Sequence, residues 1–363
     1  MNNCPLCREC APQTIYEVRC MPVFQNKVYD TEEDAKKAVT GDVVLVQCQY
    51  CGFVLNGEFN DELMRYDENY QNEQTHSHYF QSYLREIIEL LKSKGLLSGK
   101  IIEIGSGKGF FIDRLLQNGV DAIGFDPAYE GDNPRIIKDY FGDSYQAINA
   151  DLVILRHTLE HIKKPLDFLH TIAKSNSYKG KIFIEVPCFD WIRGKNAFWD
   201  IYYEHCNYFT TQTLRSMFTA SHAGKLFRDQ YLYLIADFRD MKPYVTRDGK
   251  PVILTDSLFA QGFDRYRQFV AMNKYLMVWG AGAKGATFVN LVDSDRVFIR
   301  GLIDINPKKQ NRYIPKTAHK IYGTEVLRSE KVQTILVMNE NYLNEITNTV
   351  SNPDITLYAL GLL

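Results

Sequence analysis

A strand that passes through a glycine-rich turn into a helix, IIEIGSGKGFFIDRL at residues 101–115, restricts the chain to a small number of folds. Glycine lets the backbone approach a ligand closely at the carboxyl edge of a parallel sheet. The turn has G-x-G-x-G spacing rather than the G-x-G-x-x-G of dinucleotide-binding folds, and it contains no G-K-[ST] phosphate loop. Glu103 opens the turn, which argues against a pyrophosphate and favours a cationic or hydroxyl-bearing ligand.

Strand and helix patterns alternate along most of the chain, which predicts an α/β architecture with a mostly parallel, doubly wound sheet. A second, smaller α/β unit of nucleotide-fold type follows a boundary near 241–255. We therefore expect three domains, at 1–75, 76–240 and 241–363. The expected strands lie at 42–48, 53–56, 100–104, 120–126, 150–157, 180–187, 226–239, 275–280, 298–306, 334–339 and 355–360, and the main helices at 79–95, 109–119, 165–175, 210–221, 257–274, 281–292 and 340–350.

The composition is that of a soluble globular protein. Of the 363 residues 45% are apolar, and the net charge is −2, so we expect neither a nucleic-acid partner nor an anionic membrane surface. No apolar run approaches the ~20 residues of a membrane-spanning helix, and the N-terminus has no signal pattern, so we expect a cytoplasmic protein. Aromatic residues reach 13%, which fits either a saccharide or nucleotide ligand or a tyrosine-rich core.

Six of the eight cysteines lie in the first 51 residues, and four of them form two C-x2-C pairs. Cys4 and Cys7 are separated from Cys48 and Cys51 by forty residues. Each pair can hold one side of a tetrahedral zinc ion through two thiolates, and four thiolates leave no open coordination position. We therefore expect a structural Zn2+ site that fastens this short segment together. Unliganded surface thiols are the alternative, and Cys10 can replace Cys4 or Cys7.

Two features downstream of the glycine turn indicate the ligand. The second strand ends in Asp126, where a carboxylate can accept hydrogen bonds from ribose hydroxyls, and the fourth strand reads DLVILRHTLEHI. Together with the turn, these elements resemble class I S-adenosylmethionine-dependent methyltransferases. The resemblance implies that Asp126 binds the ribose, that Pro127 borders the adenine, and that Glu103 and the turn face the amino-acid part of the cofactor. The turn residues so assigned are Gly105, Ser106, Gly107 and Gly109. An NAD-type Rossmann domain is the alternative.

His157 and His161 are expected on one face of the helix that follows the fourth strand. Two histidines four residues apart can bind a metal, but Glu160 does not complete an H-E-x-x-H motif and no third ligand is visible in the sequence. We expect both histidines to line the cofactor and substrate cleft or to pack against neighbouring elements. His157 directly follows the strand, and we assign it to the cofactor.

The segment YYEHCNYF at 202–209 follows the fifth strand by about fifteen residues, at the edge where open α/β folds place their ligands. It resembles the Tyr-x-Glu-His-x-x-Tyr-Phe signature of sugar C-methyltransferases that act on nucleotide-linked keto-deoxysugars. The cysteine spacing and VWGAGAKGATF at 278–288 resemble the same family, so the resemblance covers nearly the whole chain. It implies a small zinc module, a class I methyltransferase sheet and a smaller Rossmann-like, substrate-binding domain, in that order.

Carbon methylation needs a nucleophilic carbon, which is usually obtained by removing a proton next to a ketone. A histidine suits this task, and a neighbouring carboxylate and a tyrosine hydroxyl can support it. We therefore expect His205 to be the general base, with Glu204 and Tyr202 in support. The alternative is that His205 only hydrogen-bonds a buried turn. The further expected substrate contacts are Tyr66, Tyr70, His76, Tyr203 and Asn207.

Gly280, Gly282 and Gly285 form a true G-x-G-x-x-G between a strand and a helix, and Asp304 ends the next strand. Alone, this pattern is typical of dinucleotide binding. The unit has only about half the length of a full dinucleotide fold, however, and the resemblance assigns it to the substrate. We expect Gly282 and Lys284 to contact the pyrophosphate of a nucleotide sugar at the helix N-terminus. A purely structural unit and an NAD site are the alternatives.

The sugar, the nucleotide, the methylated atom and the oligomeric state do not follow from the sequence. O- or N-methylation of a saccharide or another small metabolite is the first alternative function. A nucleotide- or NAD-binding module with an idle methyltransferase fold is the second. The sequence favours an S-adenosylmethionine-dependent enzyme that methylates carbon in a nucleotide-linked keto-deoxysugar.

Overall fold

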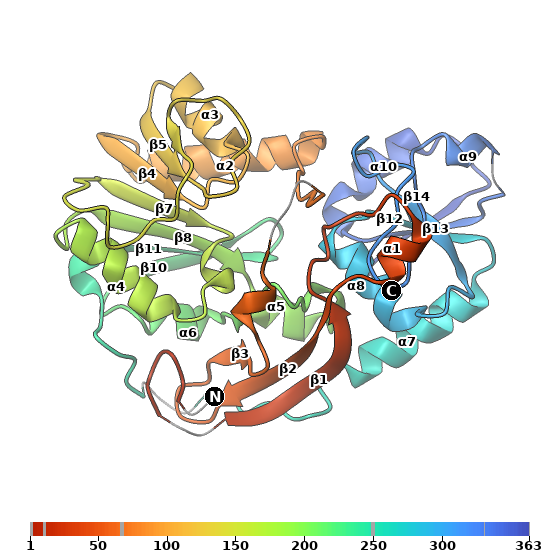
Figure 1. Ribbon diagram of the computed structural model, residues 1–363, viewed down its shortest axis with the longest axis horizontal. Helices are drawn as coiled ribbons and strands as arrows, with labels where there is room; N and C mark the ends of the chain where they lie inside the picture. The colour runs from red at the N-terminus through yellow and green to blue at the C-terminus, as the bar shows by residue number, and fades with distance from the viewer. Residues whose placement is uncertain (1–2, 10–11, 66–68, 248–250, 330, 363) are drawn as a thin grey trace.

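The strands of the chain form three sheets (Figure 1). The computed structural model describes residues 3–9, 12–65, 69–247, 251–329 and 331–362. Two α/β units, here called the central unit and the C-terminal unit, lie side by side, and an N-terminal antiparallel sheet lies below them in the view of Figure 1. None of the described helices combines the length and apolarity that crossing a membrane requires.

The central unit contains a seven-stranded sheet in the order β10-β11-β8-β7-β4-β5-β6. Its strands β4 to β8 run parallel, and β11 is antiparallel to both of its neighbours. The prediction of a mostly parallel sheet with closing strands is confirmed. The strands are β4 (Lys100–Ile104), β5 (Asp121–Phe125), β6 (Ile136–Ile137), β7 (Leu152–Arg156), β8 (Lys181–Pro187), β10 (His222–Leu226) and β11 (Tyr231–Asp237).

Helices cover both faces of this sheet because its strands bury residues on each side. Along β7, Leu152 and Ile154 pack in the same core cluster as α2 and α3, whereas Val153 and Leu155 pack in the cluster of α4 and α6. The N-cap of α6 is Thr210, whose side chain accepts a hydrogen bond from the Thr213 backbone N–H. The helices are α2 (His78–Ser93), α3 (Phe110–Gln117), α4 (Pro165–Ser175), α5 (Phe189–Gly194) and α6 (Thr211–Arg215).

The C-terminal unit contains a five-stranded, all-parallel sheet in the order β14-β13-β12-β15-β16. The predicted alternation is confirmed; the sequence missed only β14 and α9, which are too short to show periodicity. The elements are α7 (Ala260–Met272), β12 (Leu276–Trp279), α8 (Ala283–Val292), β13 (Ile299–Ile303), β14 (Ile321–Tyr322), α9 (Val326–Ser329), β15 (Thr334–Val337), α10 (Leu343–Thr349) and β16 (Thr356–Ala359).

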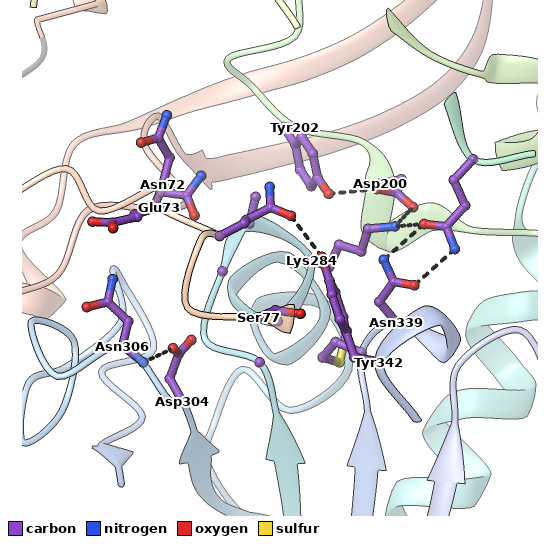
Figure 2. A pocket seen from close by; sticks show the side chains of 18 of the residues that line it. Asn72, Glu73, Ser77, Asp200, Tyr202, Lys284, Asp304, Asn306, Asn339 and Tyr342 are labelled. Atoms are coloured by element: carbon purple, nitrogen blue, oxygen red, sulfur yellow. Dashed lines mark hydrogen bonds and ion pairs between the residues drawn. The ribbon is translucent and has the colours of Figure 1, made fainter. Parts of the chain in front are cut away.

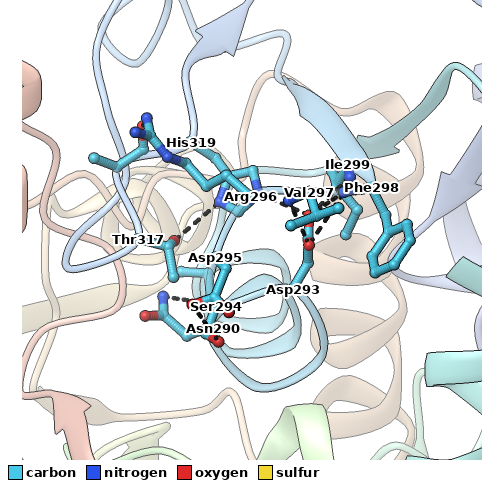
Figure 3. A network of polar contacts seen from close by, with 12 residues as sticks. Asn290, Asp293, Ser294, Asp295, Arg296, Val297, Phe298, Ile299, Thr317 and His319 are labelled. Atoms are coloured by element: carbon cyan, nitrogen blue, oxygen red, sulfur yellow. Dashed lines mark hydrogen bonds and ion pairs between the residues drawn. The ribbon is translucent and has the colours of Figure 1, made fainter. Parts of the chain in front are cut away.

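A buried carboxylate fixes the connection from α8 to β13 (Figure 3). Asp293 accepts hydrogen bonds from three backbone N–H groups, those of Val297, Phe298 and Ile299. Its Oδ2 also lies 3.3 Å from Nε2 of the buried His319. A carboxylate that collects this many donors compensates for its own burial and holds the turn in one conformation. The glycine turn that opens α8 is therefore carried on a rigid βαβ unit.

The N-terminal sheet is antiparallel and contains one strand from far along the chain. Its order is β1-β2-β3-β9, and β9 comes from the YYEHCNYF segment. The sequence missed β1 and the short helix α1, and nothing in it indicated that β9 joins this sheet. The elements are β1 (Pro12–Pro22), α1 (Glu32–Lys36), β2 (Thr40–Cys48), β3 (Val54–Asn56) and β9 (Asn207–Tyr208).

Candidate active site

A cavity of about 410 Å³ lies where the central unit, the N-terminal segment and the C-terminal unit meet (Figure 2). Its walls come from segment 70–77, the loop after β7, residues 200–205 and the turns after β12 and β13. His161 and eight of the residues that the sequence assigned to catalysis, cofactor or substrate line it, and Tyr66 lies outside the described residues. The eight are Tyr70, His76, His157, Tyr202, Glu204, His205, Gly282 and Lys284.

The first glycine turn lies beside this cavity rather than in its lining. Nζ of Lys108 in the turn is 3.8 Å from Glu73, which does line the cavity. A side chain at Gly105 would collide with Thr158, and one at Gly109 with Ile136, so these two glycines allow close packing. Gly107 has a φ of +54° and faces open space, which leaves its backbone accessible to a ligand.

Unsatisfied polar atoms under the turn fit the amino-acid part of S-adenosylmethionine. Oε2 of Glu103 and Oγ of Ser106 are buried and have no hydrogen-bond partner among the described residues. Asp126 accepts hydrogen bonds from the backbone N–H groups of Gly107 (2.7 Å) and Ala128 (2.9 Å), so it also shapes the turn. Asp126 is only half-buried, as is Pro127 beside it, so both are accessible to a ligand.

A buried charge cluster lies below the turn. Nε of Arg156 is 2.8 Å from Oε2 of Glu185, and Nη1 of Arg156 is 3.9 Å from Oε1 of Glu103. Nε2 of His157 lies 3.3 Å from Oε1 of Glu185, which also accepts a hydrogen bond from Tyr83. Each buried charge therefore has a partner of opposite sign, as burial requires.

The cluster shifts several pKa values. Burial would by itself lower the pKa of His157, but the nearby carboxylates, Glu185 first, outweigh burial and raise this pKa to about 9. Burial would raise the pKa of Glu185, but Arg156 and His157 lower it to about 2. Burial raises the pKa of Glu103 to about 7 although Arg156 opposes the shift. At neutral pH, His157 is therefore cationic, and Glu103 is partly protonated.

The two histidines after β7 do not share one α-helix, so this expectation was wrong. His157 has a φ of +50° in the loop after the strand, and His161 ends the 3-10 helix Leu159–His161. The backbone N–H of His157 still donates to Glu185 O of β8, and the positive φ of His157 then turns the chain out of the strand. This turn brings His161 to His205, with ring centroids 4.8 Å apart.

His205 lies in a dense group of aromatic rings that lines the cavity. Its ring contacts Tyr202 edge-on at 4.7 Å, and the interplanar angle is 71°. Burial lowers the pKa of His205 well below its ordinary value, and the neighbouring His161 and His157 add to this shift. His205 is therefore a neutral imidazole at physiological pH and offers a lone pair rather than a proton.

Glu204 does not orient His205 in the expected way. Its carboxylate accepts hydrogen bonds from the Tyr70 hydroxyl at 2.7 Å and from the Gln25 backbone N–H at 3.2 Å. Nδ1 of His205 has no hydrogen-bond partner in the part of the chain that the structure describes. Glu204 instead ties segment 70–77 and the N-terminal segment to the cavity wall.

Tyr203 and Asn207 point away from the cavity, contrary to expectation. Side chains alternate along this extended segment, so the neighbours of Tyr203 face the cavity while its own ring, 1% exposed, packs against Gly41 in the core. The Tyr203 hydroxyl accepts from the Asn60 backbone N–H at 2.9 Å. Asn207 pairs with β3, and its Nδ2 donates to Ile162 O.

Lys284 reaches from the C-terminal unit into the central unit (Figure 2). Its Nζ lies 2.9 Å from Oδ2 of Asp200 and 2.9 Å from Oε1 of Gln230, and Asp200 also accepts from the Tyr202 hydroxyl at 2.7 Å. Gln230 exchanges two hydrogen bonds with Asn339 of the C-terminal unit. Sequence reasoning missed Asp200, Gln230 and Asn339, because only the fold pairs residues so distant along the chain.

The second glycine turn borders the cavity and has the same support as the first. Oδ2 of Asp304 accepts a hydrogen bond from the Ala281 backbone N–H at 2.9 Å, as Asp126 does for Gly107. Gly285 packs so closely on the Gly280 carbonyl that a side chain would collide with it. Lys309, only 4% exposed, donates to Ala281 O and adds a cation to the lining, which the sequence did not single out as buried.

The four cysteines of the two C-x2-C pairs are buried together. The Sγ atoms of Cys4 and Cys51 are 3.7 Å apart, and those of Cys7 and Cys48 are 3.6 Å apart. All four sulfur atoms lie within 4.8 Å of one another. Gly52 follows the second pair with a φ of +80°, as expected for the turn behind it. Cys10 lies outside the described residues.

Comparison with known proteins assigns the two α/β units. Residues 75–222 match the methyltransferase domain family, and residues 263–353 match the C-methyltransferase C-terminal domain family. The chain is an S-adenosylmethionine-dependent methyltransferase. Its C-terminal unit is similar to the C-terminal domain of C-methyltransferases.

The relatives compared with this methyltransferase have low sequence identity to it. It is 23% identical to the C-methyltransferase NovU of Streptomyces niveus over 305 residues, which are 73% of this chain and 72% of NovU. Among solved structures, a Pyrococcus horikoshii OT3 protein is 13% identical (TM-score 0.36; 48% of this chain, 99% of that one). A putative O-methyltransferase from Nostoc punctiforme PCC 73102 is 20% identical (TM-score 0.35). The match covers 42% of this chain and 55% of the Nostoc protein, so this chain spans about half of that protein's length.

Replacement of Glu103 tests the charge cluster without any ligand. A carboxyl group whose folded-state pKa is raised to about 7 contributes stability that is fully present below its unfolded-state pKa and is lost as pH rises through 7. The wild type should therefore lose free energy of unfolding between pH 4.5 and 7, and Glu103→Gln should not. The difference between the two proteins should change by on the order of 3 kcal/mol over this range, in favour of the variant. Urea unfolding across this range measures the difference. The exposed Glu86→Gln is the matched control, and a flat difference for Glu103→Gln would contradict the assignment.

Proposed function

We propose that the methyltransferase C-methylates a nucleotide-linked keto-deoxysugar next to its ketone, through an enolate that His205 forms as general base. The observation that carries this proposal is the position of a neutral, half-buried histidine in a cavity shared by the central and C-terminal units. The match of YYEHCNYF to the sugar C-methyltransferase signature and the similarity to NovU support it.

The reaction requires two events at one carbon. His205 takes the proton from the carbon beside the ketone, and the electrons of the C–H bond become the enolate. Glu103, the 105–109 turn and Asp126 would hold S-adenosylmethionine, which would supply an electrophilic methyl group. The enolate carbon would form the new C–C bond as the S–C bond breaks, and the electrons of that bond would stay on sulfur. The low pKa of His205 keeps its lone pair available at neutral pH.

The C-terminal unit supplies the features that a nucleotide diphosphate needs. Its second glycine turn opens the ten-residue helix α8, whose N-terminus favours an anion. The buried Lys309 and the partly buried Lys284 add positive charge to the lining. We therefore place the diphosphate at this turn and the keto-sugar between it and His205.

Deuterium exchange tests the base directly. The wild-type enzyme, with S-adenosylmethionine omitted, should exchange deuterium from D2O into the carbon beside the ketone of a nucleotide-linked keto-deoxysugar, measured by mass spectrometry. His205→Asn should slow this exchange by at least ~100-fold, because general-base catalysis contributes about 10²–10⁴-fold. His222→Asn, an exposed residue on β10, is the matched control.

Two outcomes separate the competing functions. Methyl transfer by the wild type without any exchange would contradict the enolate route and favour O- or N-methylation. Exchange that survives in His205→Asn would keep carbon methylation but reject His205 as the base.

We propose in addition that Cys4, Cys7, Cys48 and Cys51 hold a structural Zn2+ ion. A tetrahedral zinc with Zn–S bonds of ~2.3 Å places neighbouring sulfur atoms ~3.8 Å apart, and the two closest pairs here are at 3.7 and 3.6 Å. All four ligands are buried, and four thiolates complete the coordination, so the ion would act on structure rather than on substrate.

Loss of the ion should destabilise the N-terminal sheet and, through β9, the segment that carries His205. Cys48→Ser should remove one equivalent of zinc, measured by mass spectrometry of the metal content, and should speed amide hydrogen exchange in β3 and β9, because β2 and β3 hold β9. The exposed Cys20→Ser should retain the zinc. A Cys48→Ser protein with a full equivalent of zinc, or with unchanged exchange in β9, would contradict this account.

A further inference from the structure

Three side chains converge in one corner of the cavity with the spacing of metal ligands. One carboxylate oxygen of Glu160, one ring nitrogen of His161 and one of His205 lie within 4.8 Å of one another. All three residues line the cavity, so a solute can reach them. The group unites residues from the loop after β7 with the 201–209 segment, which explains why the sequence showed no third ligand beside His161.

The Glu160 carboxylate and one ring nitrogen of His205 are buried without the partners that buried polar groups normally have. Glu160 is 1% exposed, and neither of its carboxylate oxygens has a hydrogen bond among the described residues. Oε1 of Glu160 lies 3.4 Å from Nδ1 of His157 and can form an ion pair with it. Oε2 of Glu160 has no hydrogen-bond partner among the described residues. Nδ1 of His205 is likewise buried and unpaired. Such orphaned groups indicate an ion or another polar species that belongs between them.

The third ligand is held as metal-bound histidines are held. Nδ1 of His161 lies 2.9 Å from the Glu204 carbonyl oxygen. A carbonyl can only accept a hydrogen bond, so Nδ1 carries the proton and Nε2 carries the lone pair. A backbone carbonyl on the far nitrogen is the usual second contact of a metal-binding imidazole, because it fixes both tautomer and ring orientation.

We propose that Glu160, His161 and His205 form a binding site for one divalent transition-metal ion of the Zn2+ type, and that an ion bound there inhibits methyl transfer. Two imidazoles and one carboxylate favour Zn2+ or Co2+ over Mg2+ or Ca2+, which prefer oxygen ligands. The three residues leave coordination positions open, unlike the four cysteines. The inhibition rests on the proposed function, because the ion occupies the lone pair with which His205 would take the proton; the binding does not.

Binding is tested with the full chain after its cysteine site has been saturated with Zn2+. Co2+ titration, followed by visible absorption and calorimetry, should show one further equivalent without the thiolate charge-transfer band that Co2+ at the cysteines would give. Glu160→Gln, His161→Asn and His205→Asn should each weaken this binding by at least ~10-fold, since even the loss of an outer contact costs about 10–100-fold. His222→Asn should not weaken it, and Mg2+ should not compete.

Circular dichroism and S-adenosylmethionine affinity establish that each variant is folded. The absence of a further equivalent in the wild type would overturn the site, as would binding that all three variants retain.

Inhibition is measured in the deuterium-exchange assay with added Zn2+. Exchange by the wild type should fall as the site fills, and in Glu160→Gln the zinc concentration for half-inhibition should rise by the same factor as the dissociation constant. Exchange that persists with the site filled would overturn the inhibitory half of the proposal. Failure of the proposed function has a different signature, because exchange is then absent before any zinc is added.

Discussion

The pairing of β9 with β3 fixes the segment that carries His205. Val54 pairs with Tyr208 and Leu55 with Asn207, so the segment that carries His205 becomes the edge of the N-terminal sheet. Backbone pairing fixes the direction in which successive side chains point, and it thereby turns Tyr202 and Glu204 to the cavity and Tyr203 to the core. This backbone pairing also holds the His205 ring in the cavity wall although its Nδ1 has no hydrogen-bond partner among the described residues.

A second long-range contact lies at the junction of the two α/β units. Lys284 and Asn339 of the C-terminal unit meet Asp200 and Gln230 of the central unit in a network that is largely buried. Asp200 also holds the Tyr202 hydroxyl, so the contact that joins the units ends one side chain away from His205. Since a buried charge needs its partner, separation of the units would leave Asp200 uncompensated. Docking of the C-terminal unit and the geometry of the active site are thus coupled.

Local patterns predicted the architecture but not the contacts between units. Apolar periodicity and glycine spacing act over a few residues, and they indicated both parallel sheets, the cysteine cluster and the two turns stabilised by Asp126 and Asp304. The joining of β9 to β3, the partners of Lys284 and the tie between Glu204 and Tyr70 depend on residues more than fifty positions apart. The helical prediction for His157 was wrong because this residue still pairs with Glu185 of β8, a contact that the local spacing of the histidines does not indicate.

We propose that the cofactor at the first glycine turn, which lies beside the cavity, and the nucleotide end of the substrate at the second turn, which lines it, meet near His205. The most direct measurement is a crystal structure of the full chain with S-adenosylhomocysteine and a nucleoside diphosphate. We expect the homocysteine part at residues 105–109 and the diphosphate at residues 280–285 beside Lys309, with His205 between them. A diphosphate bound outside this cavity, or both ligands bound at one turn, would contradict this proposal.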